Sequence, residues 1–322
     1  AMPSRLESKA LIGCASVSHC CFSPDSRDTL LATTTSLGEA TAWDFESQKV
    51  FMSFDLRPDD MAVLRGCAFS PDGSTLAIGG GGSRNEVQLW DLKARSCRKL
   101  IPPGGVARPS YGGLGREGPG GCDIAFHPDG KSVLVTYGDG MPRLWDLANT
   151  AEPTLTLDYQ YSCFCAFSPD GARFAIAGFG TTIFGQGAEG WKVVGETPSS
   201  TLNRGVDFSV QGQLATGDGE GYVTLWDSRH ADRVWQARSH RADVLDVAFH
   251  PSGEALCSVA RDRNIIIHNV SDGERSSTNA ILPLACGWSP SGLLGVATAN
   301  GVELFDVSGL DETLVKAAAS TQ

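Results

Sequence analysis

The stretch GYVTLWDSR, Gly221–Arg229, ends a short alternating run on a Trp-Asp pair. Val223 and Leu225 recur at a spacing of two, which is typical of a β-strand. The Asp-Ser pair that follows favours a turn, because these side chains hydrogen-bond to nearby backbone groups. The stretch therefore predicts a strand that ends in a tight turn.

The same ending recurs along the chain. The clear copies are AWDF, QLWDL, RLWDL and TLWDS, whose indoles belong to Trp43, Trp90, Trp145 and Trp226. A recurring unit of this kind predicts one repeat architecture rather than two ordinary domains.

A second signature sets the phase of the repeat. An aromatic residue is followed by a short turn sequence of the form Ser/His-Pro-Asp/Ser-Gly, in which Pro pre-sets φ and Gly accepts a positive φ. Seven copies occur, at separations of 47, 57, 41, 41, 41 and 39 residues. They begin at Phe22, Phe69, Phe126, Phe167, Phe208, Phe249 and Trp288.

These phased motifs resemble the WD-repeat family, whose repeats run about 40–45 residues, and the resemblance covers nearly the whole chain. It implies an all-β, seven-bladed β-propeller of four-stranded antiparallel blades, closed by the N-terminal strand. Leu6–Ile12 is the candidate for that strand, with the C-terminal tail as a competitor. Three copies depart from Trp-Asp: GWK at Trp191, IHNV at His268 and LFDV at Phe305.

The domain expectation is one propeller over residues 1–322. We expect residues 1–4 to be a tag remnant or flexible start, and residues 311–322 to be a flexible tail. The native chain begins later or belongs to a longer protein on this interpretation. We expect the propeller to be monomeric.

Composition narrows the class of partner. The net charge of −11 works against bulk binding of nucleic acid. Ten cysteines show no disulfide framework and no zinc-ligand spacing, which favours a reducing compartment, the cytoplasm or the nucleus. No apolar run is long enough to predict membrane insertion. No motif calls for a cofactor or a metal, and no phosphate loop or nucleophile elbow occurs.

The resemblance also assigns two faces to the ring. The Pro-Asp-Gly turns and the segments after Trp-Asp share one face, here called the turn face. The crossings between repeats and the turns between second and third strands share the other, the crossing face, where this family usually takes partners. The insertion Ile101–Gly121 falls in such a crossing, and we expect Arg108, Tyr111 and Arg116 to bind a partner. The alternative is a mobile Gly-rich linker without contacts.

The sixth repeat carries the most polar set. It matches the family's buried His-Ser-Asp chain at His240, Ser258 and Asp262. The resemblance implies that this chain has a structural and not a catalytic role. It implies the same structural role for the four indoles of the Trp-Asp endings. Arg241, Arg261 and Arg263 fall on crossing-face loops. They either form a small basic patch for a partner or are ordinary solvated charges.

One further match concerns the turn face. Asp227 and Arg229 reproduce the Trp-Asp-x-Arg element by which WD-repeat substrate receptors dock on the adaptor of cullin ubiquitin ligases. The match is short, so an incidental or structural arginine is the alternative.

The leading hypothesis is a non-catalytic protein-interaction scaffold within a multiprotein complex, which binds a protein or peptide on the crossing face. The second hypothesis is a substrate receptor of a cullin ligase. A third, from a different class, is a propeller hydrolase, which would need inward His and Asp or Glu around a metal.

Overall fold

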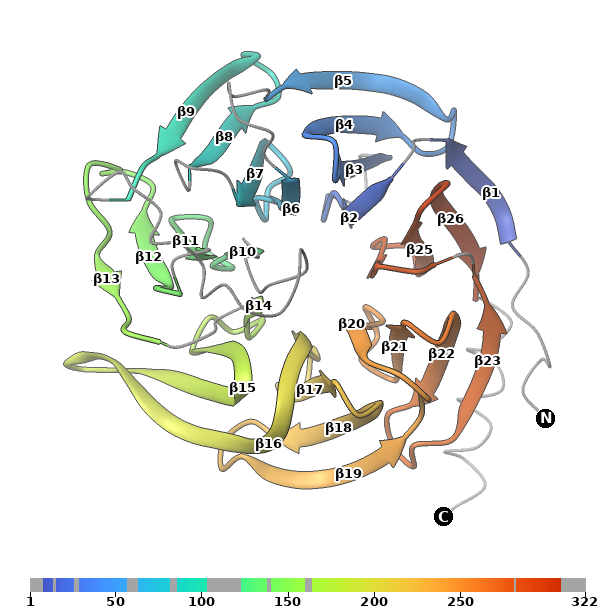
Figure 1. Ribbon diagram of the computed structural model, residues 1–322. Coiled ribbons are helices and arrows are strands. Elements are labelled where there is room, and N and C mark those ends of the chain that lie inside the picture. The colour runs from blue at the N-terminus through green and yellow to red at the C-terminus, as the bar shows by residue number, and fades with distance from the viewer. Residues whose placement is uncertain are drawn as a thin grey trace.

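The protein is built from β-strands arranged around a ring (Figure 1). The structure is a computed structural model that describes residues 8–13, 16–25, 29–56, 63–81, 86–102, 123–137, 140–159, 164–280 and 282–307. Within these residues the chain forms five four-stranded sheets and one six-stranded sheet, and neighbouring strands pair antiparallel. The all-β expectation is confirmed.

The strands follow the repeats in order. The first sheet holds β2 (Val17–Phe22), β3 (Leu30–Thr35), β4 (Glu39–Asp44) and β5 (Lys49–Asp55). The second holds β6 (Val63–Phe69), β7 (Thr75–Gly81), β8 (Val87–Asp91) and β9 (Ser96–Leu100). The third holds β10 (Asp123–Phe126), β11 (Ser132–Thr136), β12 (Arg143–Asp146) and β13 (Leu155–Thr156).

The remaining repeats complete the ring. The six-stranded sheet holds β14 (Phe164–Phe167), β15 (Arg173–Gly187), β16 (Gly190–Phe208), β17 (Gln213–Asp218), β18 (Tyr222–Asp227) and β19 (Asp232–Arg238). The next sheet holds β20 (Val244–Phe249), β21 (Ala255–Ala260), β22 (Asn264–Asn269) and β23 (Arg275–Asn279). The last holds β24 (Ala285–Trp288), β25 (Leu293–Thr298), β26 (Gly301–Asp306) and β1 (Ser8–Gly13).

The fourth and fifth repeats share one sheet because β15 and β16 are long. The first part of β15 pairs with β14, its last part pairs with the start of β16, and the end of β16 pairs with β17. Two repeats are therefore joined by continuous strands instead of lying in separate four-stranded sheets.

The Trp-Asp position of the fourth repeat differs from the one expected at Trp191. In the first, second, third and sixth repeats the residue after the Trp-Asp position donates its backbone N–H to the carbonyl of the residue before the second strand. Gln186 makes this bond to Ala172 O at 2.9 Å, so Phe184-Gly185 occupies the Trp-Asp position. Trp191 lies on β16 instead and packs against Phe174, with ring centroids 4.7 Å apart. The equivalent donors elsewhere are Phe45, Leu92, Leu147 and Val270.

The N-terminal strand lies where Leu6–Ile12 was expected. Strand β1 pairs antiparallel with β26, with Ile12 opposite Val302. Ile12 is buried in a cluster that also includes Val17 and Leu31 of the first sheet and Leu304 of the last. The expected tag remnant at 1–4 and the tail at 311–322 lie outside the described residues.

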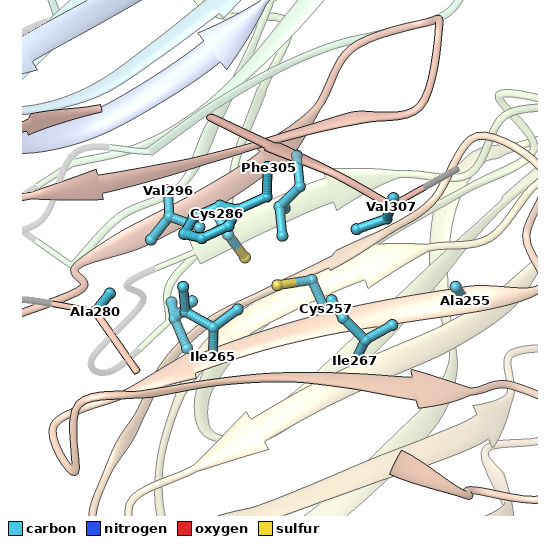
Figure 2. Packing of buried hydrophobic residues seen from close by; sticks show 11 residues of the cluster. Ala255, Cys257, Ile265, Ile267, Ala280, Cys286, Val296, Phe305 and Val307 are labelled. Atoms are coloured by element: carbon cyan, nitrogen blue, oxygen red, sulfur yellow. The ribbon is translucent and has the colours of Figure 1, made fainter. Parts of the chain in front are cut away.

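Apolar clusters lie between neighbouring sheets. Residues from β21 and β22 pack against residues from β24, β25 and β26, among them Val296 and Phe305 (Figure 2). Cys257 and Cys286 point their sulfur atoms toward each other across this contact. The seven cysteines of the described part are all free thiols. Across that same part, no helix has the length and apolarity to span a membrane.

Candidate functional site

A cavity of about 510 Å³ opens on the crossing face, beside the first residues of several inner strands. This volume is in the range of small-ligand and peptide side-chain sites. We call it the crossing-face cavity. Its walls include Ser18, Ser36, Phe164, Arg204, Leu245, Arg261 and the segment 282–285.

Two arginines line the cavity, one from a strand and one from a turn. Arg204 lies near the point where β16 becomes an inner strand, and Arg261 begins the turn between β21 and β22. The Asp243 carboxylate contacts both guanidinium groups, at 3.9 Å from Arg204 and 3.5 Å from Arg261. One acidic group therefore contacts both basic ones.

An apolar rim lies beside these arginines. Leu282 and Leu284, in the crossing from β23 to β24, are 48% and 41% exposed, with the buried Pro283 between them. Leu37, which follows Ser36 of the cavity wall, is 66% exposed. Exposed apolar side chains around a cavity are typical of surfaces that bind partners.

Two titratable groups of the inner strands also face this cavity. Burial raises the pKa of Asp246 well above its usual range, while hydrogen bonds from Cys286 N and Val247 N oppose the shift. Burial lowers the pKa of His19 to about 4. At neutral pH His19 is therefore uncharged, and the ionisation of Asp246 is disfavoured.

The three crossing-face arginines predicted from the sequence lie on two neighbouring segments. Arg241 N donates to Asp262 Oδ2 at 2.8 Å, which ties the crossing before β20 to the turn that holds Arg261 and Arg263. All three side chains are exposed, and Arg261 lines the cavity. Their role in binding stays a prediction.

The insertion residues Arg108, Tyr111 and Arg116 lie outside the described residues. The structure therefore does not test whether they contact a partner, and that expectation stays a prediction.

The structure brings His240, Ser258 and Asp262 together in a buried chain. His240 Nδ1 donates to Asp262 Oδ1 at 3.1 Å, and His240 Nε2 lies 2.8 Å from Ser258 Oγ. His268 Nε2 continues the chain, 3.0 Å from Ser258 Oγ. The Asp262 carboxylate accepts from the N–H at His240 Nδ1, so the other nitrogen of this neutral ring, Nε2, is an acceptor. His240 Nε2 therefore accepts from the Ser258 hydroxyl, and the Ser258 oxygen accepts in turn from the N–H at His268 Nε2.

The pKa values of this chain follow from burial. Burial lowers the pKa of His240, although Asp262 opposes the shift, and lowers that of His268 to about 3. Burial acts to raise the pKa of Asp262, but hydrogen bonds from Arg241 N and Asn264 hold it below its usual value. These shifts favour neutral imidazoles beside one carboxylate, an arrangement that rigidifies the repeat.

The four predicted indoles have different environments. Trp43 and Trp226 donate to Thr33 Oγ1 and Thr216 Oγ1, both at 2.9 Å. Trp90 Nε1 lies 3.1 Å from Gln88 Oε1. Trp145 is fully buried, and its Nε1 has no hydrogen-bond partner among the described residues.

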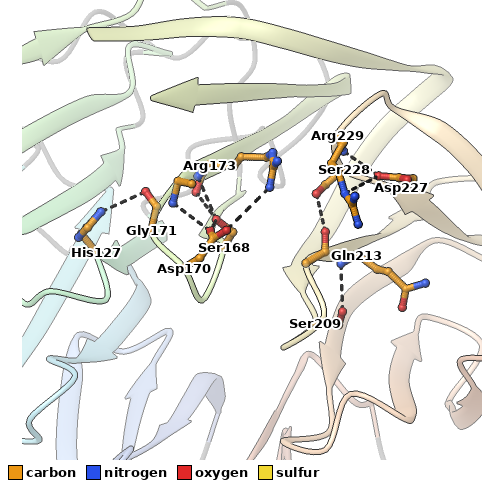
Figure 3. A network of polar contacts seen from close by, with 12 residues as sticks. His127, Ser168, Asp170, Gly171, Arg173, Ser209, Gln213, Asp227, Ser228 and Arg229 are labelled. Carbon is orange, nitrogen blue, oxygen red and sulfur yellow. Dashed lines mark hydrogen bonds and ion pairs between the residues drawn. The ribbon is translucent and has the colours of Figure 1, made fainter. Parts of the chain in front are cut away.

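A second hollow, of about 350 Å³, lies on the turn face (Figure 3). It is lined by Asp170 and Arg173 of the β14–β15 turn, by the β16–β17 turn, and by Arg229 after β18. Arg229 is 68% exposed, and its Nε lies 3.8 Å from Asp227 Oδ1. The backbone N–H of Arg229 also donates to Asp227 Oδ1, which closes the turn.

Sequence reasoning missed Arg204 and the leucines of segment 282–284. The insertion was singled out because it lies in a crossing between repeats. Leu282–Leu284 also lies in such a crossing, since it joins β23 to β24. Arg204 had no such signal. It precedes an ordinary inner strand, and only the fold places it opposite Arg261. Among the described residues, no group of three or more His, Cys, Asp or Glu is arranged to hold a metal.

Comparison with known proteins supports the repeat interpretation. The family model "WD domain, G-beta repeat" matches residues 117–146 and 232–269. The guanine nucleotide-binding protein subunit beta of Saccharomyces cerevisiae is 28% identical over 136 residues, 39% of this chain and 32% of that protein. Protein sof1 of Schizosaccharomyces pombe is 32% identical over 95 residues, 30% of this chain and 20% of that protein.

A third relative covers more of the chain. The nuclear distribution protein PAC1 of Arthroderma benhamiae is 24% identical over 189 residues, 56% of this chain and 36% of that protein. The chain spans about a third or less of the length of these curated relatives. The matches therefore concern the repeats and not the whole of any relative.

Proposed function

Because the chain belongs to the WD-repeat family, we propose that it is a non-catalytic protein-interaction scaffold that binds a partner protein or peptide on the crossing face. The crossing-face cavity carries this proposal. It combines about 510 Å³ of space with exposed leucines and two positioned arginines. Free thiols in the described part support a reducing compartment, the cytoplasm or the nucleus.

The test compares partner capture by the wild-type chain with capture by two surface variants, in lysate from the source cells. Leu284→Ser with Arg261→Glu changes the cavity, whereas Arg229→Glu changes the opposite face. We expect partners to be lost with the cavity variant and kept with Arg229→Glu, with circular dichroism and Tm showing that both variants fold. Partners that survive the cavity variant contradict the proposal.

The insertion is a separate arm of this test. A chain with residues 104–121 replaced by a short Gly-Ser linker keeps the cavity residues. Partner loss in this chain alone assigns the binding to the insertion, including Arg108, Tyr111 and Arg116, instead of to the cavity.

The second candidate function is a substrate receptor of a cullin ubiquitin ligase. The exposure of Arg229 beside the turn-face hollow favours it, since a docking arginine must be accessible. Its test is direct binding of the purified ligase adaptor, which Arg229→Glu should weaken at least about tenfold. Arg233→Glu, an exposed arginine on β19, is the matched control. Undiminished binding by Arg229→Glu removes this candidate.

A further inference from the structure

We infer that the crossing-face cavity takes an acidic segment of its partner, in which a carboxylate stands beside a bulky apolar side chain. This inference rests on the proposed function and adds the chemistry of the occupant. It follows from the charges and the apolar surfaces of the cavity wall, taken together.

The positive charge comes from Arg204 and Arg261. Both guanidinium groups contact the single carboxylate of Asp243 and line the same cavity. Both side chains are partly exposed, at 24% and 40%, so an incoming group can reach them. A carboxylate is the complementary group, because guanidinium–carboxylate hydrogen bonds are charge-assisted. The site stands out on a chain whose net charge is −11.

The other charged group of the wall does not cancel this preference. Burial raises the pKa of Asp246, so its negative charge is disfavoured at neutral pH. His19 is neutral there, because burial lowers its pKa to about 4. An acidic occupant therefore meets the Arg204 and Arg261 guanidiniums, and of the described wall residues Asp246 and His19 add little charge of their own.

The apolar requirement comes from the segment 282–284. Leu282 and Leu284 together expose apolar surface on the cavity rim, and Pro283 between them limits the freedom of the backbone. An apolar side chain next to the carboxylate would remove this surface from water, which favours binding. A carboxylate alone would leave the leucines exposed.

A protein segment fits these features better than a nucleic acid. Single-stranded nucleic acids bind along basic grooves with several stacking aromatic side chains. Among the described residues that line the cavity, Phe164 is the only aromatic side chain apart from the His19 ring. The strongly negative net charge also opposes association with a polyanion.

The experiment is selection of random dodecapeptides by phage display on the purified full chain. We expect the selected peptides to be enriched in Asp or Glu adjacent to Leu, Ile or Phe. A synthetic copy of one selected peptide is then titrated by fluorescence anisotropy. We expect Arg261→Glu to weaken its binding at least about tenfold, as loss of a charge-assisted hydrogen bond implies. Arg233→Glu should leave the affinity unchanged.

Three further measurements separate the contribution of charge from that of apolar contact. An Asp→Asn or Glu→Gln copy of the peptide should lose affinity with the wild-type chain, and should lose much less with Arg261→Glu. Leu284→Ser should weaken the acidic peptide and its amide copy alike, because it removes apolar contact only. The salt dependence of binding should fall with Arg261→Glu.

The outcomes distinguish the inference from the proposed function. Peptides that bind at the cavity, as shown by loss with Leu284→Ser, but carry no acidic excess overturn the inference and leave the proposed function standing. Peptides that keep full affinity for both cavity variants overturn both. Selection of no peptide overturns the inference. Competition by a twelve-residue uridine oligonucleotide at the cavity overturns it in favour of a nucleic acid.

Discussion

Side-chain hydroxyls explain why the repeats differ in their buried polar bonds. The hydroxyl that receives the Trp43 indole is Thr33, and the one that receives the Trp226 indole is Thr216. The equivalent position in the sixth repeat is Ser258, which bonds His268 in place of an indole. In the third repeat this position is the apolar Val135, so the Trp145 indole finds no such acceptor.

This difference predicts unequal costs for two matched substitutions. Trp226→Phe removes a donor from Thr216 and should lower the free energy of unfolding by about 1–2 kcal/mol. Trp145→Phe removes a buried donor that has no partner among the described residues, and should cost less. Chemical denaturation of both variants measures the difference. Equal losses would show that the Thr216 bond contributes nothing.

Removal of the whole Trp226 side chain should cost more stability than removal of its N–H group alone. Trp226 is 6% exposed and packs against Leu214 and Val206. Trp226→Ala should therefore cost about 3–5 kcal/mol, as a large-to-small change in a core. Trp191 is only half-buried, on the edge of its cluster, so Trp191→Ala should cost less.

The turns of neighbouring repeats pack onto one another. A polar side chain of one turn reaches the next turn, from the second position in the case of His127 and from the fourth in the case of Gln211. His127 Nε2 donates to Gly171 O at 3.1 Å, and Gln211 Nε2 donates to Ser252 O at 3.1 Å (Figure 3 shows the His127 contact). A Cβ at Gly171 would lie 2.5 Å from His127 Nε2. These contacts link consecutive sheets on the turn face.

This contact predicts a difference between two glycine substitutions. Gly171 and Gly212 hold the same turn position with φ of +69° and +79°, but nothing lies within 4 Å of a Cβ at Gly212. Gly212→Ala should cost about 1 kcal/mol for the left-handed backbone alone. Gly171→Ala should cost at least about 1 kcal/mol more, measured by denaturation. If His127→Ala does not relieve this excess, the contact is not its cause.

Aspartates on the inner strands form a second kind of link. Asp207 Oδ2 accepts from Phe249 N at 2.7 Å, and Asp123 Oδ2 accepts from Cys165 N at 2.9 Å. Each bond joins one repeat to the next. Burial raises the pKa of Asp207 to about 7 and that of Asp123 to about 6.

These raised values set the sign of a pH dependence. The folded pKa of Asp207 exceeds the value of about 3.9 expected when unfolded. Its contribution to stability is therefore fully present below about pH 4 and is lost as pH rises through about 7. Asp207→Asn should flatten this decline in the free energy of unfolding, measured by denaturation from pH 4 to 8, by up to about 4 kcal/mol, since one pKa unit corresponds to about 1.4 kcal/mol.

The exposed carboxylate of Asp72, in a turn, has the opposite pH dependence. Hydrogen bonds from Ser70 and Ser74 lower the pKa of Asp72, so its contribution is lost as pH falls instead. Asp72→Asn should leave the decline between pH 4 and 8 in place. A wild-type slope in Asp207→Asn would contradict the assigned role of Asp207.

The ring joins its ends through residues from both parts of the chain. The inner strand β24 of the last sheet contacts β2 of the first, and β1 covers the edge of β26 (Figure 1). Ile12 and Val17, on either side of this junction, are both buried in one cluster. Stability should therefore depend on β1 more than its six residues suggest.

Removal of β1 tests this dependence. Deletion of residues 1–13 should lower Tm by at least about 5 °C, because Ile12 leaves a core cluster and the edge of β26 loses its partner strand. The uncovered edge should also promote self-association, which light scattering can detect. Deletion of residues 1–7 leaves β1 whole and is the control. Equal Tm values for the two deletions would contradict the junction.

The repeat number, the strand order and the turn positions could all be predicted from the printed sequence. Each Ser-Pro-Asp-Gly turn and Trp-Asp ending specifies its own hairpin through contacts only a few residues apart, as at Asp72 and Ser70. Seven phased copies then imply a ring, since each sheet must bury its faces against the next.

The fourth repeat and the cavity depended on contacts between distant residues. Phe184 holds the Trp-Asp position instead of Trp191, as the bond from Gln186 N to Ala172 O shows, and no Trp-Asp pair in the sequence marks that position. Arg204 of β16 and Arg261 of the β21–β22 turn lie close together because the ring brings these two segments to one carboxylate, that of Asp243. Local sequence specifies hairpins, whereas side chains from separate repeats converge only once the sheets have packed around a common centre.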